Sequence, residues 1–228
     1  MKEDFVLQEH RALAEKYVPH LRYDKMEPYS LEAVGYTVFT LPEKSPSCNF
    51  HVAMELGETV IEYAFFYDFD IQHLYDLEHV FVKINETGQI TGVVSSFHGK
   101  FLNSFLEGEL AFEDTHPVLY VQPGKHAFMP LPHYFRLFLD RDGCCGRNAG
   151  SDGFLVAPMF AGRLRTDRDF DRKVERYIRE NHAFVPSWEF VTEYSGLRRT
   201  EEVLMTYEEL DRLIVERMTQ WKEIIEND

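Results

Sequence analysis

The segment from residue 31 to residue 128 most constrains the fold, because it consists of short aromatic and β-branched runs separated by Pro, Gly and Asn. Such runs are typical of strands that pack against another layer. No helical pattern separates them, which favours an antiparallel β-sandwich over a parallel sheet with crossover helices. A loop over 85–89 with Gly near its end also predicts a hairpin. The predicted strands are 33–41, 59–68, 77–84, 90–97 and 118–122.

Helical patterns lie on both sides of this β core. Apolar residues at helical spacing predict helices over roughly 3–17, 167–181 and 206–225. Thr206, with Glu209 three residues later, forms a capping box at the start of the last helix. Residues 143–153 are rich in Gly and predict a loop. We therefore expect a mainly β fold with flanking helices (α+β), organised as one β-sandwich domain over 1–228.

The charge balance excludes some classes of partner. The 228 residues contain 39 Asp and Glu against 24 Lys and Arg, a formal net charge of −15. Nucleic acids and anionic membrane surfaces bind clustered Lys and Arg, so neither is expected as the main partner. The sequence contains no run of about 20 apolar residues that would span a membrane.

The chain begins without a basic and apolar export signal, and its three cysteines are an odd number. Both features predict reduced thiols in the cytoplasm. Cys144 and Cys145 are adjacent, and no base or thiolate-favouring setting accompanies them, so thiol catalysis is not favoured. The sequence leaves their role and the oligomeric state open.

Negative charge is concentrated between residues 45 and 82, which contain no Lys or Arg. Carboxylates crowded among aromatic residues must protonate, pair or bind a cation. The seven acidic residues of this segment are Glu55, Glu58, Glu62, Asp68, Asp70, Asp76 and Glu78.

Four residues of this segment can converge at one rim of the sandwich. Asp70 follows an aromatic strand, His73 lies in the next turn, and the two-residue period of a strand puts Asp76 and Glu78 on one face. His79 falls on the opposite face of the strand and is therefore not a predicted metal ligand. Three oxygens and one imidazole suit Mg²⁺, Ca²⁺ or Mn²⁺, with Zn²⁺ also possible. A hydrogen-bonded polar cluster is the alternative.

The order of these residues resembles a known family. The pattern Asp70, then His73-x-x-Asp76-x-Glu78, is similar to the Gly-His-Arg-His-Asp-Trp-Glu segment of the necrosis- and ethylene-inducing peptide-like (NLP) cytolysins. It is closer to the Asp-Trp-Glu-His element of their vacuolar protein sorting-associated-type relatives. Residues 95–100 resemble the Ser-Ala-His-Gly stretch of the cytolysins, and residues 116–127 resemble the His-Pro…Gly-Ser-His-Ala run of the relatives.

The resemblance implies a β-sandwich with a divalent cation at Asp70, His73, Asp76 and Glu78. Three positions depart from the family heptapeptide, because Gln72, Tyr75 and Leu77 replace its Gly, second His and Trp. The cytolysins are secreted, carry disulfides and bind sphingolipid headgroups at plant membranes. Without a matching export signal and cysteine pair, their toxin activity is not expected here.

Two further histidines, His98 and His126, follow strand ends and are candidates for a ligand, a residue that orients one, or a general base. Packed rim histidines are the alternative. The first functional hypothesis is a cytoplasmic module that binds a small polar or anionic ligand, such as a sugar or lipid headgroup, at the cation. The second is a metal-dependent hydrolase that uses His98 or His126 as acid or base. The third is a purely structural cation.

Overall fold

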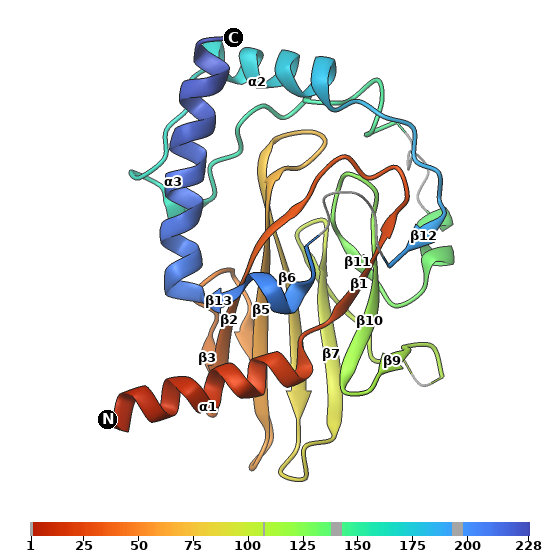
Figure 1. The fold of residues 1–228 in the computed structure, drawn as a ribbon, viewed down its shortest axis with the longest axis vertical. Coiled ribbons are helices and arrows are strands. Elements are labelled where there is room, and N and C mark those ends of the chain that lie inside the picture. The colour runs from red at the N-terminus through yellow and green to blue at the C-terminus, as the bar shows by residue number, and fades with distance from the viewer. Residues whose placement is uncertain (1, 107, 138–142, 193–197) are drawn as a thin grey trace.

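The computed structural model describes residues 2–106, 108–137, 143–192 and 198–228. A six-stranded sheet forms the centre of the fold (Figure 1). Its strands, in spatial order, are β13 (Leu204–Thr206), β2 (Leu31–Phe39), β5 (Thr59–Phe69), β6 (Leu74–Ile84), β7 (Ile90–Phe97) and β8 (Lys100–Asn103).

A second sheet packs on one face of the first. Its order is β11 (Phe128–Met129), β10 (His116–Val121), β1 (His20–Asp24) and β12 (Phe190–Val191), with β9 (Phe112–Glu113) paired to β10. A separate hairpin joins β3 (Glu43–Lys44) to β4 (His51–Val52).

The helices lie around the two sheets (Figure 1). The α-helices are α1 (Lys2–Tyr17), α2 (Arg168–Asn181) and α3 (Tyr207–Glu226), and the short 3₁₀ helices are η1 (Pro132–Leu137), η2 (Pro158–Phe160) and η3 (Thr200–Val203).

Alternation along β5 produces two hydrophobic clusters, one on each face of the central sheet. Phe65 and Tyr67 face the second sheet and pack with Val121 and Phe128. Between them, Phe66 faces the other way and packs in the cluster formed with α2 and α3. Because successive side chains of a strand point to opposite faces, the aromatic run of β5 fills both layers. The central sheet is therefore covered on both faces.

The prediction of a β-rich fold with flanking helices is confirmed. All five predicted strands and all three predicted helices are present, with ends that differ by a few residues, and 143–153 consists of turns. The hairpin of β6 and β7 is antiparallel, as expected. The sheets are mixed rather than wholly antiparallel, because β1 pairs with β10 in parallel and β13 pairs with β2 in parallel.

Thr206 caps α3 as the sequence predicts, with its side chain accepting from the Glu209 backbone and Glu209 accepting from the Thr206 backbone. We expect Thr206→Ala to lower the free energy of unfolding by about 1 kcal/mol, since the Glu209 N–H at the helix start loses its acceptor. Urea denaturation measures the change. Thr219→Ala in the exposed part of α3 is the control and should change stability by less than about 0.5 kcal/mol. Equal effects of the two substitutions would contradict the capping role.

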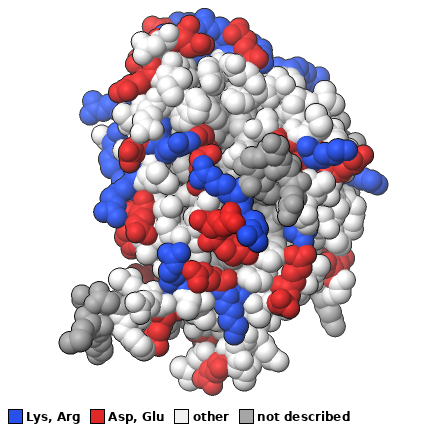
Figure 2. Space-filling model, viewed as in Figure 1, with Lys and Arg blue, Asp and Glu red and all other residues white. Residues whose placement is uncertain are grey.

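Within the described residues, no helix combines the length and the apolar character needed to cross a membrane. On the face shown in Figure 2, acidic and basic side chains are interspersed among the described residues. This face therefore carries mixed charge rather than one broad basic patch.

Candidate functional site

The turn between β5 and β6 positions Asp70 and His73. The Asp70 N–H donates to the His73 carbonyl at 2.9 Å, and the Asp70 Oδ1 accepts from the Gln72 N–H at 2.6 Å. An aspartate that accepts from the backbone two residues later stabilises a tight turn. The turn therefore holds the Asp70 carboxylate and the His73 ring on the same side of the rim.

The Gly-rich loop 143–153 supports this turn from outside. The Gly150 N–H donates to the Ile71 carbonyl at 2.8 Å, and the Leu74 N–H donates to the Gly153 carbonyl at 2.8 Å. Gly150 has a φ of +78°, and a Cβ there would lie 2.4 Å from the backbone oxygen of Glu175. Only Gly fits both the conformation and the space. The loop is thus a structural support of the site.

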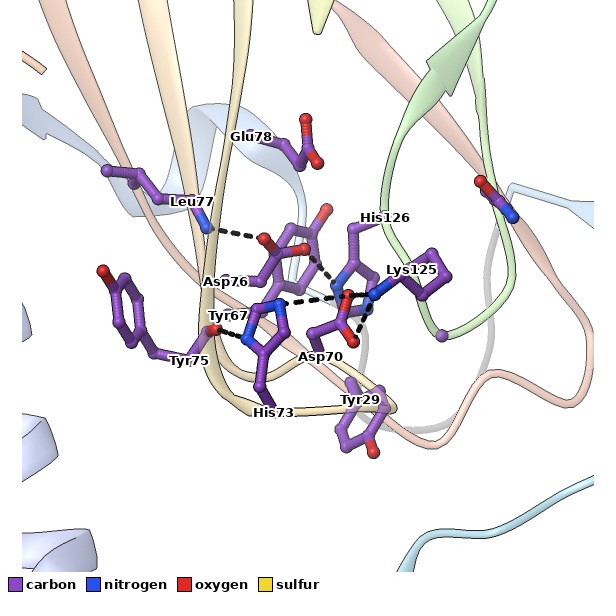
Figure 3. Close-up of polar contacts among 12 residues, drawn as sticks. Tyr29, Tyr67, Asp70, His73, Tyr75, Asp76, Leu77, Glu78, Lys125 and His126 are labelled. Carbon is purple, nitrogen blue, oxygen red and sulfur yellow. Dashed lines mark hydrogen bonds and ion pairs between the residues drawn. The ribbon is translucent and has the colours of Figure 1, made fainter. Parts of the chain in front are cut away.

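Asp70, His73 and Asp76 form a compact group of potential metal ligands, with donor atoms that all lie within 4.8 Å of one another. The His73 Nδ1 lies 2.7 Å from the Tyr75 carbonyl, which requires a proton on that nitrogen. The His73 Nε2, 3.8 Å from the Asp70 Oδ2, is then the ring nitrogen that can coordinate a metal ion. A backbone carbonyl that fixes the tautomer in this way is common behind metal-binding histidines. Figure 3 shows the three side chains converging.

Lys125 extends into this group from the turn between β10 and β11 (Figure 3). Its Nζ lies 2.6 Å from the Asp70 Oδ2 and 2.8 Å from the Asp70 Oδ1. Burial lowers the pKa of Lys125, but the Asp70 carboxylate outweighs burial and raises it above the usual value. The ammonium group therefore stays charged and compensates Asp70 from within the protein.

His126 is a second internal cation. Its ring is fully buried, stacks on Tyr67 at 3.8 Å, and lies 3.0 Å from the Asp76 Oδ2 and 3.6 Å from the Glu27 Oε1. Burial lowers the pKa of His126, but its contacts with Asp76 and Glu27 raise it overall to about 9. At neutral pH the imidazolium joins two carboxylates, and this arrangement does not favour a general base.

Glu78 lies outside the compact group. It shares the face of Asp76, as the strand period predicts, but its carboxyl accepts from the Ser96 hydroxyl. Burial and then the neighbouring Asp76 raise the pKa of Glu78 well above its usual value. Burial and Asp76 thus favour the neutral form of Glu78 beside the group.

His98, a candidate from the sequence, and His79, which the sequence excluded as a ligand, both lie outside the compact group. His98 has a φ of +48° and contacts the Gln122 side chain at 2.8 Å through its Nε2. His79 points to the opposite face of the sheet, where it contacts Phe101.

A cleft of about 880 Å³ lies beside the compact group. His73 and Asp76 belong to both the group and the cleft wall. The rest of the wall combines serine and asparagine side chains from 45–49 with an apolar segment over 155–159. A mostly apolar wall with a few polar groups is typical of small-molecule sites.

Two charged residues of the site were missed by sequence reasoning. Glu27 is distant in sequence and has no motif, yet its Oε2 accepts from the Gly124 N–H at 2.8 Å. Lys125 directly precedes the candidate His126, and this position is the one feature of the sequence that could have pointed to Lys125. No disulfide involves Cys48, Cys144 or Cys145, all of which are described.

Neither a family model nor a curated protein matches the chain. Among solved structures, necrosis- and ethylene-inducing protein 2 from the causal agent of cocoa's witches' broom disease is 22% identical. That match covers 51% of this chain and 66% of the other, with a TM-score of 0.35. NLPPya solved with glucosamine is 16% identical, covering 52% and 65% with a TM-score of 0.37, and NLPPya with mannosamine is 17% identical, covering 52% and 65% with a TM-score of 0.36.

The matched region spans just under two thirds of those chains and about half of this one. The structural neighbours are thus NLP toxin-fold proteins, the family that the motifs resemble. The relation to vacuolar sorting-type proteins stays a prediction.

Proposed function

We propose that this chain binds a divalent cation at Asp70, His73 and Asp76 and binds a small polar or anionic ligand in the adjoining cleft. One observation carries the proposal: His73 and Asp76 belong to both the compact donor group and the cleft wall. A cation held there would face the space that a ligand enters.

The donor chemistry fits a divalent cation at three of the four residues predicted from the sequence. Two carboxylates and an imidazole that coordinates through Nε2 suit Mg²⁺, Ca²⁺ or Mn²⁺, and Zn²⁺ is also compatible. Glu78, bonded to Ser96, is not needed for this set. When bound, the cation would supply positive charge and coordination positions for hydroxyl or anionic oxygens.

The protein's own residues would prepare the site. The Tyr75 carbonyl fixes the His73 tautomer, and the His126 imidazolium holds one oxygen of Asp76. Lys125 competes with the cation for Asp70. The affinity for the cation is therefore lowered, because the ion pair between Lys125 and Asp70 must be weakened when the cation binds. The double ion pair of His126 supports a binding module rather than a hydrolase that uses this histidine as a base.

The cation is tested with chelated protein refilled with Mg²⁺, Ca²⁺ or Mn²⁺ in equilibrium dialysis. We expect about one ion per chain and at least tenfold weaker binding in His73→Ala, since a ligand is removed. His51→Ala, which removes an exposed histidine of β4, is the matched control and should bind as the wild type does. Absence of stoichiometric binding in the wild type would overturn the proposal.

The ligand is tested by calorimetric titration of the loaded and the chelated protein. Glucosamine and mannosamine, bound in two of the structures above, are the first sugar probes, and phosphocholine represents a lipid headgroup. Binding that requires the cation supports the proposal. A cation that raises the melting temperature while none of the probes binds would favour the structural role instead.

A further inference from the structure

A second group of metal-ligating side chains lies on the opposite face of the central sheet. Glu62 is in the middle of β5 and is only 1% exposed. On the adjacent strand β6, His79 is 6% exposed and pairs with Ala64, two residues from Glu62. Because both residues share the parity of Phe66 and Phe81, their side chains point away from the second sheet. The His79 side chain therefore points to the sheet face opposite Asp76 and Glu78, although His79 and Asp76 both line the cleft.

Both buried side chains carry a polar atom without a hydrogen-bond partner, the Glu62 Oε2 and the His79 Nε2. In contrast, the Glu62 Oε1 accepts from the hydroxyls of Ser45 and Ser47, the former at 2.7 Å. The two serines thus fix the carboxylate while its other oxygen stays unsatisfied. Leaving a buried polar atom without a partner costs about 1–3 kcal/mol, so each of these two atoms would gain from a bound ligand.

The turn of the β3–β4 hairpin brings Cys48 to the same point. The Ser45 N–H donates to the Phe50 carbonyl at 2.9 Å, and the Cys48 N–H donates to the Ser45 Oγ at 3.1 Å. This turn places the Cys48 Sγ 3.7 Å from the Glu62 Oε1. Donor atoms of Cys48, Glu62 and His79 all lie within 4.8 Å of one another.

We infer that Cys48, Glu62 and His79 form a Zn²⁺ site. One thiolate, one imidazole and one carboxylate suit this borderline ion, whereas Mg²⁺ and Ca²⁺ prefer oxygen alone. In a tetrahedral zinc site the donor atoms are about 3.2–3.8 Å apart, so closing the group around the ion requires a contraction of roughly 1 Å. Cys48 and His79 also line the cleft, so the fourth coordination position faces a space open to water or a ligand.

The same geometry argues against a nucleophilic thiol. Burial and then the Glu62 carboxyl raise the pKa of Cys48 to about 11, so the unligated side chain is a thiol at neutral pH. A catalytic cysteine needs a setting that favours the thiolate. A metal ion deprotonates a coordinating thiol directly, which is consistent with a binding role for Cys48.

Cobalt substitution tests the site, because Co²⁺ bound by a thiolate gives a near-ultraviolet charge-transfer band that oxygen and imidazole ligands do not give. Chelated protein is titrated with Co²⁺ and then with competing Zn²⁺. We expect one such band per chain in the wild type, its loss in Cys48→Ser, and at least tenfold weaker binding in His79→Gln. Cys144→Ser, which removes a different buried thiol, and His73→Ala should keep the band.

Retention of the band in His73→Ala would show that the thiolate site does not depend on the Asp70 group. The two proposed sites can therefore be contradicted independently of each other. Circular dichroism establishes whether Cys48→Ser and His79→Gln fold. If they do not, the wild type decides the question by mass-spectrometric mapping of thiol alkylation, with and without Zn²⁺. Zinc that slows alkylation of Cys48 at least tenfold supports the site. No thiolate band in the wild type, a band that persists in Cys48→Ser, or alkylation of Cys48 unchanged by zinc would overturn it.

Discussion

Replacing His126 by Asn is expected to lower the free energy of unfolding of the chelated protein by about 3–5 kcal/mol at pH 6. The imidazolium lies between Asp76 and Glu27 with no exposed surface, so its removal leaves two buried carboxylates without their shared cation. Asn tolerates the left-handed backbone of this position, where φ is +54°. Backbone strain is therefore not the cause of the loss.

The pH dependence identifies the charge as the cause. The pKa of His126 is about 9 in the folded protein, against 6.5 for an ordinary histidine. Between these values the folded state binds more protons than the unfolded state, so this contribution is complete below pH 6.5 and is lost as pH rises through 9. The contribution of His126 to the free energy of unfolding that is lost over this pH range is about 3 kcal/mol.

Chemical denaturation of the wild type and of His126→Asn between pH 6 and pH 10 measures this effect. The stability difference between the two proteins should shrink as pH rises. His98→Asn is the matched control, because His98 also has a positive φ, +48°. It should cost about 1 kcal/mol or less. A pH-independent difference for His126→Asn, or an equal loss in both variants, would contradict the buried ion pair.

Replacing Lys125 by Met should raise the affinity for the divalent cation by roughly 10- to 100-fold, or about 1.4 kcal/mol for each factor of ten. The Lys125 ammonium is 2.6 Å from the Asp70 Oδ2, and both side chains are largely buried. A divalent ion must share or displace this contact, and Met removes the competing charge while keeping the volume. Cation titration by calorimetry gives the affinity.

The same substitution should destabilise the chelated protein by about 3 kcal/mol, because Asp70 loses its buried partner. Added cation should restore that stability by binding only the folded state. Lys83→Met is the control, since Lys83 pairs with Glu58 in a more exposed setting, and its effect should be below about 1 kcal/mol. Weaker or unchanged cation binding in Lys125→Met would contradict the competition.

The sequence predicted the parts of the fold that depend on near neighbours. A run of aromatic and β-branched residues marked β5, and apolar spacing with a capping box marked α3, because both signals lie within a few neighbouring residues. The short strands β1, β12 and β13 were not predicted. Their residues have little periodicity, and they become strands by pairing with distant partners.

The candidate sites divide in the same way. Asp70, His73 and Asp76 could be grouped from the sequence because one turn and one strand carry all three. Glu78 shows the limit of that reasoning, since its face was predicted but its contact with Ser96 on β7 was not. Strand register, not spacing along the chain, decides which side chains meet across a sheet.

By itself, therefore, the sequence determined a β-rich core with helices at both ends and an acidic turn with the composition of a cation site. Only the tertiary structure decided that Lys125 and His126 supply the opposing charges around that turn, and that Glu27 is a second carboxylate partner of His126. It also joined Cys48, from a hairpin, to Glu62 and His79 on neighbouring strands. The physical reason is that local periodicity is written in adjacent residues, whereas these contacts depend on chain packing and strand register.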